Sequence, residues 1–154
     1  MSLIGTIERE LRRIGAQVRK TLLRQRIGER WSTTNTGLAS REYPDYTSYL
    51  EHQRSKFDAM REKSIRGHDA RFFAALSERL AALPFPLIGK AVLCLAARQG
   101  TEVRAFIDRG AFAIGIDLNP GKENKYVVVG DFHNLHYADA SIDVVYTNSL
   151  DHAF

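Results

Sequence analysis

Two aspartates in this chain stand where a carboxylate could bind a small ligand. Asp117 ends the apolar segment 112–116, and Asp131 follows the apolar segment 126–129 and Gly130. If both segments are strands of a parallel sheet, the two carboxylates lie at one edge, where open α/β sheets bind ligands. A carboxylate on the strand beside the first can accept both hydroxyls of a ribose. Ordinary turn chemistry is the alternative for each aspartate, because Asp often bonds to its own backbone in turns.

Two more segments are expected to end at the same edge. The apolar segment 90–95 leads into the loop 96–100, and the segment 143–147 leads into 148–152. A helix over 101–109, closed by Gly110, joins the first strand to the second. Strands this apolar and β-branched are typical of a parallel sheet buried on both faces. The sequence therefore predicts an α/β fold with four strand ends around one crevice.

The order of these segments resembles the class I methyltransferases that use S-adenosylmethionine, in their small-molecule branch. The resemblance covers about residues 88–154. The matching segments are Val92-Leu93-Cys94-Leu95 for the family's first strand, Gly115-Ile116-Asp117 for its second strand and acid, Gly130-Asp131-Phe132-His133-Asn134-Leu135 for its Gly-Asp segment, and residues 139–145 leading into its fourth strand. It implies a Rossmann-like methyltransferase fold, with strands in the order 3-2-1-4. The implied reaction is methyl transfer from S-adenosylmethionine to a small molecule, such as a saccharide or another metabolite.

The same resemblance implies roles for individual residues. The cofactor-binding set is Ala96, Arg98, Gly100, Asp117, Leu118, Asp131, Phe132 and Asn148. Asp131 would hold the adenine amino group with Phe132 flanking the ring, and Asn148 would lie near the methionine moiety. His152 is the candidate catalytic residue, because the ordinary pKa of histidine suits proton transfer from an acceptor hydroxyl. Positioning can supply most of the catalysis of an in-line methyl transfer, so a base is not a requirement.

The loop after the first strand departs from the family pattern. The family has an acid at the position of Cys94 and glycines at the positions of Ala96, Arg98 and Gly100. Glycine permits a positive φ and close approach of a ligand to the backbone, so Ala96 is tolerable there if its φ is negative. The Arg98 side chain could instead pair with the methionine carboxylate of the cofactor. The alternative is a catalytically silent methyltransferase-like module that binds a partner through its amino-terminal helix.

Spacing excludes two other kinds of site. A nicotinamide-binding turn needs G-x-G-x-x-G, and the three glycine positions hold Ala96, Arg98 and Thr101. His133 and His136 are separated by two residues on a predicted loop and match no closed zinc pattern. We therefore expect neither a nicotinamide cofactor nor a metal ion.

The amino-terminal part differs in charge from the rest. Residues 1–90 carry a net charge of +7 and residues 91–154 a net charge of −3, which predicts a basic helical segment over 1–86 and a methyltransferase-like half-domain over 87–154. A helix reaching to about Ile27 carries one apolar stripe, formed by Leu3, Ile4, Ile7, Leu11, Ile14, Val18 and Leu22. Residues 3–27 could contact protein, pair as a coiled coil or lie on an anionic membrane. Nucleic acid is not expected, because no aromatic residue is interleaved with the basic ones.

The region between this helix and the sheet predicts a linker and two helices. Residues 31–40 are polar and without periodicity, which is typical of a loop or linker. A second helix is expected from Pro44-Asp45 to about Gly67, and a third is expected to be capped by Asp69 and stopped at residues 84–86. The second helix mixes aromatic and polar residues, so it either packs on the domain or covers the crevice as a lid.

Three further expectations concern the whole chain. The chain has a single cysteine, Cys94, and it shows neither a signal-peptide pattern nor an apolar run long enough to cross a bilayer. These features predict a cytoplasmic protein. The sequence ends just past the fourth strand, whereas the sheet of the family has seven, so we expect a fragment with an exposed apolar edge and little turnover. Its oligomeric state stays open.

Overall fold

A computed structural model describes residues 3–26, 30–33, 37, 39–59 and 63–150. The chain divides into two compact units, Met1–His52 and Gln53–Phe154. The predicted sheet and its flanking loops all belong to the second unit. Among the described residues, no helix has an apolar stretch long enough to cross a membrane.

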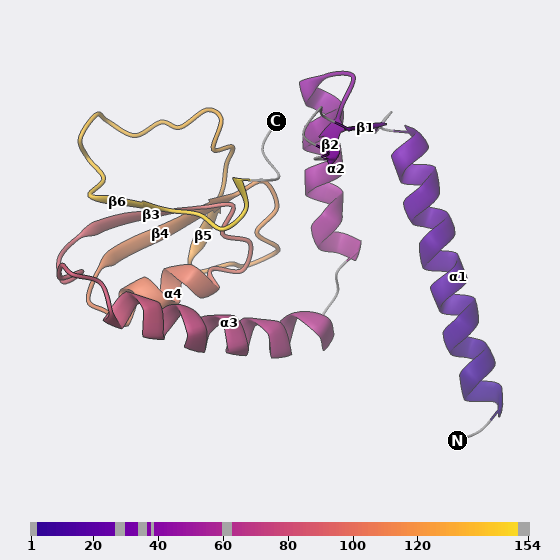
Figure 1. The fold of residues 1–154 in the computed structure, drawn as a ribbon, viewed down its shortest axis with the longest axis horizontal. Coiled ribbons are helices and arrows are strands. Elements are labelled where there is room, and N and C mark those ends of the chain that lie inside the picture. The colour runs from indigo at the N-terminus through magenta and orange to yellow at the C-terminus, as the bar shows by residue number, and fades with distance from the viewer. Residues whose placement is uncertain (1–2, 27–29, 34–36, 38, 60–62, 151–154) are drawn as a thin grey trace. The chain divides into compact units, whose positions relative to one another are not determined.

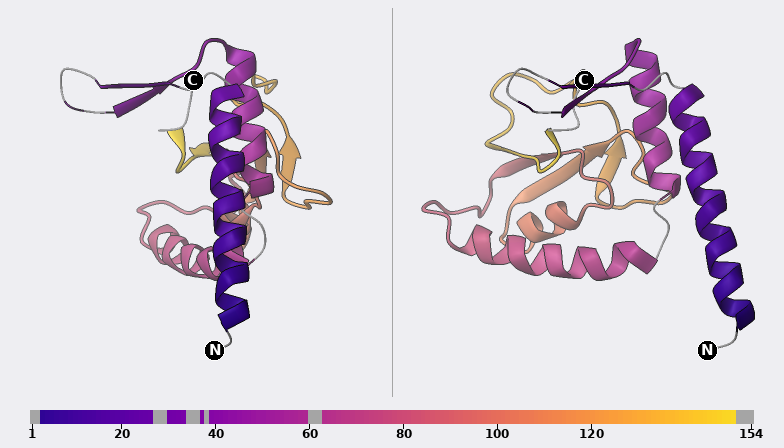
Figure 2. Two further views of the ribbon diagram at one scale, coloured as in Figure 1. Left: turned by 90° about the vertical axis from the view of Figure 1, so that its right-hand side faces the viewer. Right: turned by 45° about the vertical axis from the view of Figure 1, so that its right-hand side comes forward.

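The first unit contains a long helix and a two-stranded antiparallel sheet. Helix α1 runs over Leu3–Arg26, and strands β1 (Arg30–Thr33) and β2 (Ala39–Glu42) pair as Figure 2 shows. Trp31 lies opposite Arg41, whose guanidinium carbon is 4.7 Å from the centre of the indole ring. The prediction of a loop or linker over 31–40 is therefore wrong for residues 31–33 and 39–40, whereas residues 34–36 and 38 lie outside the described residues. Strand pairing and this cation–π contact order a segment that shows no periodicity of its own.

Helices α2 (Tyr46–Ala59) and α3 (Lys63–Ala81) correct two predicted boundaries. Gly67 does not end the second helix, and Asp69 does not cap the third, because both lie inside α3. A glycine inside a helix costs only about 1 kcal/mol, which the packing of an apolar face readily offsets. Leu76 and Leu80 supply that packing, since both are buried in the core beside the sheet.

Four parallel strands form the sheet of the second unit. They are β3 (Ala91–Leu95), β4 (Phe112–Asp117), β5 (Val127–Val129) and β6 (Val144–Tyr146), arranged β5-β4-β3-β6. The chain builds outward from β3 through β4 to β5 and then returns to the other side of β3 (Figure 1). Asp143 secures the return, because its carboxylate accepts the N–H of Ala91 at 2.8 Å and lies 3.2 Å from Nζ of Lys90.

Apolar side chains cover both faces of β3. Helices α3 and α4 (Thr101–Ile107) lie on one face of the sheet (Figure 1), where Val92, Cys94 and Phe106 are buried. Leu93 and Leu95 point to the other face and form a smaller cluster there. That cluster is completed by Ile116, Phe132 and Ile142. The continuous apolar sequence of the first strand follows from this burial on two sides.

Helix α3 belongs to the same core as the sheet. The second unit begins at Gln53, so it includes the part of the chain that sequence analysis grouped with the amino-terminal segment. The aromatic ring of Phe73 on α3 also lies 5.6 Å from the guanidinium carbon of Arg104 on α4. Helix α3, which precedes the sheet in the sequence, therefore supports one face of it.

Gly115, in the middle of β4, is expected to tolerate no side chain. A Cβ there would lie 2.7 Å from Cβ of Ala97 and 2.8 Å from Cγ2 of Val127. We expect Gly115→Ala to lower the free energy of unfolding by about 1–3 kcal/mol, as overpacking does in other cores. Urea unfolding followed by circular dichroism measures it.

The matched control is the same substitution in open space. No atom lies within 4 Å of a Cβ built on Gly15 in α1, so Gly15→Ala should preserve or increase helicity and should not destabilise the sheet. Equal destabilisation by the two variants would contradict the packing account of Gly115.

Candidate functional site

The carboxyl ends of all four parallel strands lie at one edge of the sheet. Residues 96–100 follow β3, Asp117 ends β4, Asp131 follows β5 and Asn148 follows β6. The Gly130 N–H donates to the carbonyl oxygen of Asp117 at 2.9 Å, which holds the ends of β4 and β5 together. The order in which the chain adds strands switches sides at β3, and such a switch point is where open α/β sheets bind ligands.

Asp117 ties the loop after β3 to the end of β4. Its Oδ2 accepts the Arg98 N–H at 2.9 Å, and its Oδ1 accepts the Asn119 N–H at 2.8 Å. The turn chemistry expected as an alternative is thus present. A carboxylate has about four acceptor positions, so these two bonds leave capacity for ligand hydroxyls.

Positive φ angles shape the loop 96–100. Ala96 has φ 53°, Arg98 φ 42° and Gly100 φ 79°, so the condition under which Ala96 would be tolerable in this loop, a negative φ, is not met. Gly100 is required for space as well as for backbone conformation, because a Cβ there would lie 2.6 Å from Cβ of Tyr126. Two non-glycine residues in this region of φ and ψ cost of order 1–3 kcal/mol each, so contacts around the loop must hold it.

Asn124 supplies several of those contacts, and sequence analysis did not find it. Its Nδ2 donates to the carbonyl oxygens of Arg98 at 3.1 Å and Pro120 at 2.9 Å. Its Oδ1 accepts the N–H groups of Tyr126 at 2.9 Å and Val127 at 3.0 Å. An asparagine in a turn-rich stretch is the only signal in the sequence, and that signal does not indicate a bond to a loop 26 residues away.

A further bond ties the turn after β4 to α2. The side-chain Nδ2 of Asn119 donates to the carbonyl oxygen of Arg54 at 2.7 Å, while its backbone N–H donates to Asp117. Asn119 therefore joins the end of α2 that belongs to the second unit to the strand end that carries Asp117. This contact places part of the second helix beside the end of β4, which agrees with either of its expected roles, packing on the domain or covering the strand ends.

The Arg98 side chain is a half-buried cation at this edge. Among the described residues, no acceptor forms a hydrogen bond or ion pair with its guanidinium group, although its charge acts on the carboxyl group of Glu102. A guanidinium group binds a carboxylate through two parallel hydrogen bonds. Arg98 can therefore bind an anionic group that enters the crevice.

Glu102 is a second residue that sequence analysis missed. Its side chain lies in the first turn of α4, is 5% exposed, and has a pKa raised to about 7, mainly by burial. Arg98 lowers this pKa, whereas Asp69 and Asp117 raise it. The only sequence signal for it is an acid in the first turn of a helix next to the loop, a common and unspecific pattern.

Cys94 and Thr101 complete the buried polar groups beneath the loop. Cys94 is fully buried, and burial, with a smaller effect of Glu102, raises its pKa to about 12. Its thiol is therefore protonated and unreactive at neutral pH. The Oγ1 of Thr101 is buried and forms no hydrogen bond within the described part of the chain.

Asp131 and Phe132 are held by local contacts. The Oδ1 of Asp131 accepts the His133 N–H at 2.9 Å and lies 2.9 Å from Nδ1 of the same residue. The ring of Phe132 stacks on His133 with centroids 4.5 Å apart, and it packs against the cluster that contains Leu93. The turn interpretation of Asp131 agrees with these two contacts, and Phe132 has a packing role beside the site.

The remaining predicted residues occupy less defined positions. Leu118 is half-buried next to Asp117, and Asn148 is exposed, with its Oδ1 accepting the Ser149 hydroxyl at 3.0 Å. His152 lies outside the described residues. Within the described ranges, no three His, Cys, Asp or Glu side chains come together to form a metal site.

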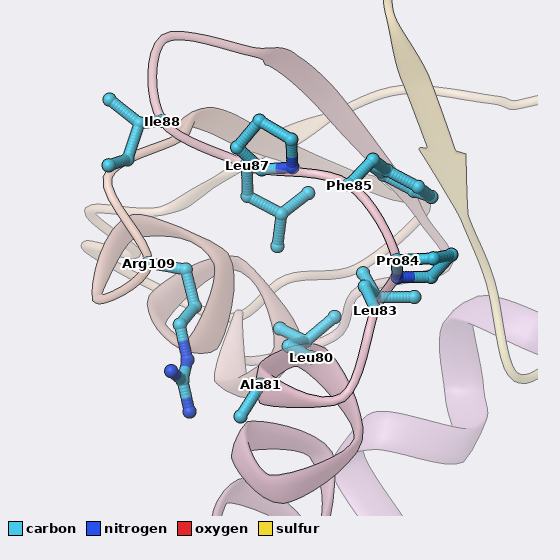
Figure 3. Close-up of a pocket in the computed structure, with 9 residues that line it drawn as sticks. Leu80, Ala81, Leu83, Pro84, Phe85, Leu87, Ile88 and Arg109 are labelled. Carbon is cyan, nitrogen blue, oxygen red and sulfur yellow. The ribbon is translucent and has the colours of Figure 1, made fainter.

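A shallow hollow of 430 Å³ lies at the opposite edge of the sheet (Figure 3). Apolar side chains from the end of α3 and from the segment that enters β3 line it, including Leu80, Leu83 and Leu87. Arg109 borders it and donates from Nη2 to the carbonyl oxygen of Ser77 at 2.7 Å. The hollow holds none of the predicted site residues.

Comparison with known proteins identifies no relative of this chain. No family model, no curated protein and no solved structure matches it. Its function has to be inferred from its residues and their geometry.

Burial of Glu102 predicts a stability that depends on pH. The ordinary pKa of this carboxyl group is 4.5, and its pKa in the folded chain is about 7. Between these values the unfolded chain releases the proton while the folded chain keeps it, so the folded state loses stability as pH rises through this window. The full difference corresponds to about 3 kcal/mol. We expect Glu102→Gln to raise the unfolding midpoint at pH 8 and to change it little at pH 4.

Glu78→Gln is the control, because Glu78 is exposed on α3. It should leave the midpoint nearly unchanged at both pH values. Thermal unfolding that shows no difference between Glu102→Gln and the parent at pH 8 would refute the account of a carboxyl group destabilised by burial.

The φ angle of Ala96 predicts that a glycine stabilises the loop. Ala96→Gly removes a left-handed alanine and should raise the free energy of unfolding by about 1 kcal/mol. The neighbouring Ala97 is buried and does not have a positive φ, so Ala97→Gly should lower the free energy of unfolding. Denaturant titration of both variants tests this, and changes of the same sign would contradict it.

Proposed function

We propose that the carboxyl edge of the sheet binds S-adenosylmethionine and that the protein transfers its methyl group to a small molecule. The observation that carries the proposal is the hydrogen bond from the Arg98 N–H to the Asp117 carboxylate at 2.9 Å. It joins a backbone loop to an acid at the ends of two adjacent central strands, where a nucleoside with a charged tail can bind along the edge.

The arrangement of the strands supports the same proposal. Counted along the chain within this sheet, the third, second, first and fourth strands lie side by side. This sheet is compatible with a Rossmann-like methyltransferase fold, which we propose for residues 87–154. The crevice then lies beside β3, between the loop 96–100 and the residues that follow β6.

The residues at the edge fit the parts of this cofactor. Asp117 keeps acceptor positions for the ribose hydroxyls, and the guanidinium group of Arg98 suits the methionine carboxylate. Asp131 can accept the adenine amino group in addition to the His133 N–H, since one carboxylate accepts several hydrogen bonds. When bound, the cofactor supplies an electrophilic methyl group on a sulfonium centre. The chain binds and orients the reactants. As part of the proposal, His152 takes the proton that the acceptor hydroxyl loses.

A second candidate function follows from the strain in the loop. Ala96 and Arg98 both carry a Cβ where the methyltransferase family has bare backbone, and both have a positive φ. Asp117 is already engaged by two backbone N–H groups. These observations favour a catalytically silent methyltransferase-like module without a cofactor, which binds a partner through its amino-terminal helix.

Calorimetric titration with S-adenosylmethionine distinguishes the two functions. We expect the parent chain to bind and Asp117→Asn to weaken binding at least about tenfold, because the ribose loses a charged acceptor. Arg98→Ala should weaken it about tenfold through the loss of the carboxylate partner. The control is Asp139→Asn, which removes the same charge from an exposed loop residue and should bind like the parent.

Two outcomes would reject the cofactor. One is the absence of binding by a parent chain whose thermal unfolding is cooperative. The other is equal binding by Asp117→Asn and Asp139→Asn. Equal binding by Arg98→Ala and the parent would reject the role of Arg98 alone.

A further inference from the structure

Helix α1 carries a long exposed apolar stripe. Its members are Ile7, Leu11, Ile14, Val18 and Leu22, with side chains between 52% and 63% exposed. Five large aliphatic residues on one side of one helix form a continuous surface that water solvates poorly. A stripe that the described part of the chain leaves this exposed indicates a binding surface.

The spacing at the carboxyl-terminal end of the stripe departs from that of a coiled coil. Its members follow one another at steps of four, three, four and four residues. A coiled coil needs alternating steps of three and four, which keep the stripe facing a supercoiled partner. The steps from Ile4 to Val18 alternate in this way, but the two successive steps of four from Ile14 to Leu22 follow a straight α-helix. A straight stripe matches a plane, such as the surface of a bilayer.

The charge of α1 defines the chemistry of that plane. The helix sequence contains seven arginines and lysines and two glutamates, so its net charge is +5. Arg12 and Arg19 are exposed and directly follow the stripe residues Leu11 and Val18, which puts both on the same flank of the stripe. Long basic side chains on the flank of an apolar stripe reach lipid phosphates while their stems stay near the acyl boundary. The same charges repel a second copy of the helix.

The two glutamates of α1 cannot offset its seven basic residues. Nη1 of Arg13 lies 3.3 Å from Oε1 of Glu10, and both side chains are well exposed. An exposed pair one turn apart contributes little to stability and is easily exchanged for a stronger anionic partner. The helix therefore offers a cationic surface and an aliphatic stripe together.

We propose that α1 binds along the surface of a membrane that contains anionic lipids. The aliphatic stripe lies in the interface between headgroups and acyl chains, and the arginines contact the phosphates. The proposal does not depend on methyl transfer. It assigns to the first unit the task of holding the chain on a lipid surface.

Vesicle flotation of the full chain tests the proposal. One set of vesicles contains phosphatidylcholine alone, and the other contains about 30 mol% phosphatidylserine, so that only the surface charge differs. We expect partitioning to the anionic vesicles to exceed partitioning to the neutral ones by at least about tenfold, since each basic residue near the surface contributes separately. The excess should shrink as salt screens the charges.

A matched pair of variants tests the stripe. Leu11→Asn removes a stripe residue and should lower partitioning to anionic vesicles by about tenfold, the effect of one buried leucine. Gln17→Asn introduces the same residue in the same helix at an exposed polar position and should leave partitioning unchanged. Circular dichroism of both variants checks that α1 is equally helical.

Several outcomes would overturn the proposal. They are no flotation of the parent chain, equal flotation on neutral and anionic vesicles, and equal effects of the two variants. Concentration-dependent dimerisation in light scattering that Leu11→Asn abolishes, without flotation, would assign the stripe to a second copy. A loss of thermal stability specific to Leu11→Asn, without flotation of the parent, would assign it to the chain's own fold.

Discussion

The hydrogen bond between the Arg98 N–H and the Asp117 carboxylate determines the shape of the whole carboxyl edge. It crosses from the loop after β3 to the end of β4, and β3 and β4 are the two strands of this sheet that have neighbours on both sides. Asn124 holds the same loop from the opposite direction through the Arg98 carbonyl oxygen. Both backbone polar groups of one residue thus have side-chain partners, which lets a short loop keep a single conformation without regular structure.

The sheet could be predicted from the sequence because each strand carries its own signal. The segments 91–95, 112–117 and 144–146 are short, apolar and bounded by turn residues, so burial on two faces is visible locally. The hairpin of β1 and β2 has no such signal, since its order depends on two polar segments that find each other. The helix boundaries predicted at Gly67 and Asp69 are wrong for the opposite reason. Both residues are typical of helix boundaries, but they lie inside a helix that tertiary packing extends.

The residues of the candidate site also fall into those that local sequence predicts and those that depend on the folded chain. Asp117 and Asp131 could be located because their chemistry follows from the end of a strand, whereas the positive φ of Ala96 arises from the loop's tertiary bonds. Glu102 and Asn124 could not be predicted for a similar reason. The burial of Glu102 and the long-range hydrogen bond of Asn124 exist only in the folded chain. Local strain and a buried acid beside conventional packing are features that proteins retain where a binding site needs them.

The clamp formed by Asp143 has a consequence for the order of folding. Asp143 and Ala91 are 52 residues apart, more than twice the separation of the paired residues Ala91 and Phe112 in β3 and β4. Closing the longer loop costs roughly 1 kcal/mol more chain entropy. The strands β3, β4 and β5 can therefore assemble first from nearby segments, and β6 joins when its distant contacts repay the closure. The carboxyl edge of the sheet gains the residues that follow β6 only in this last step, so a nascent chain can have a nearly complete core and still lack part of the edge that we propose as a binding site.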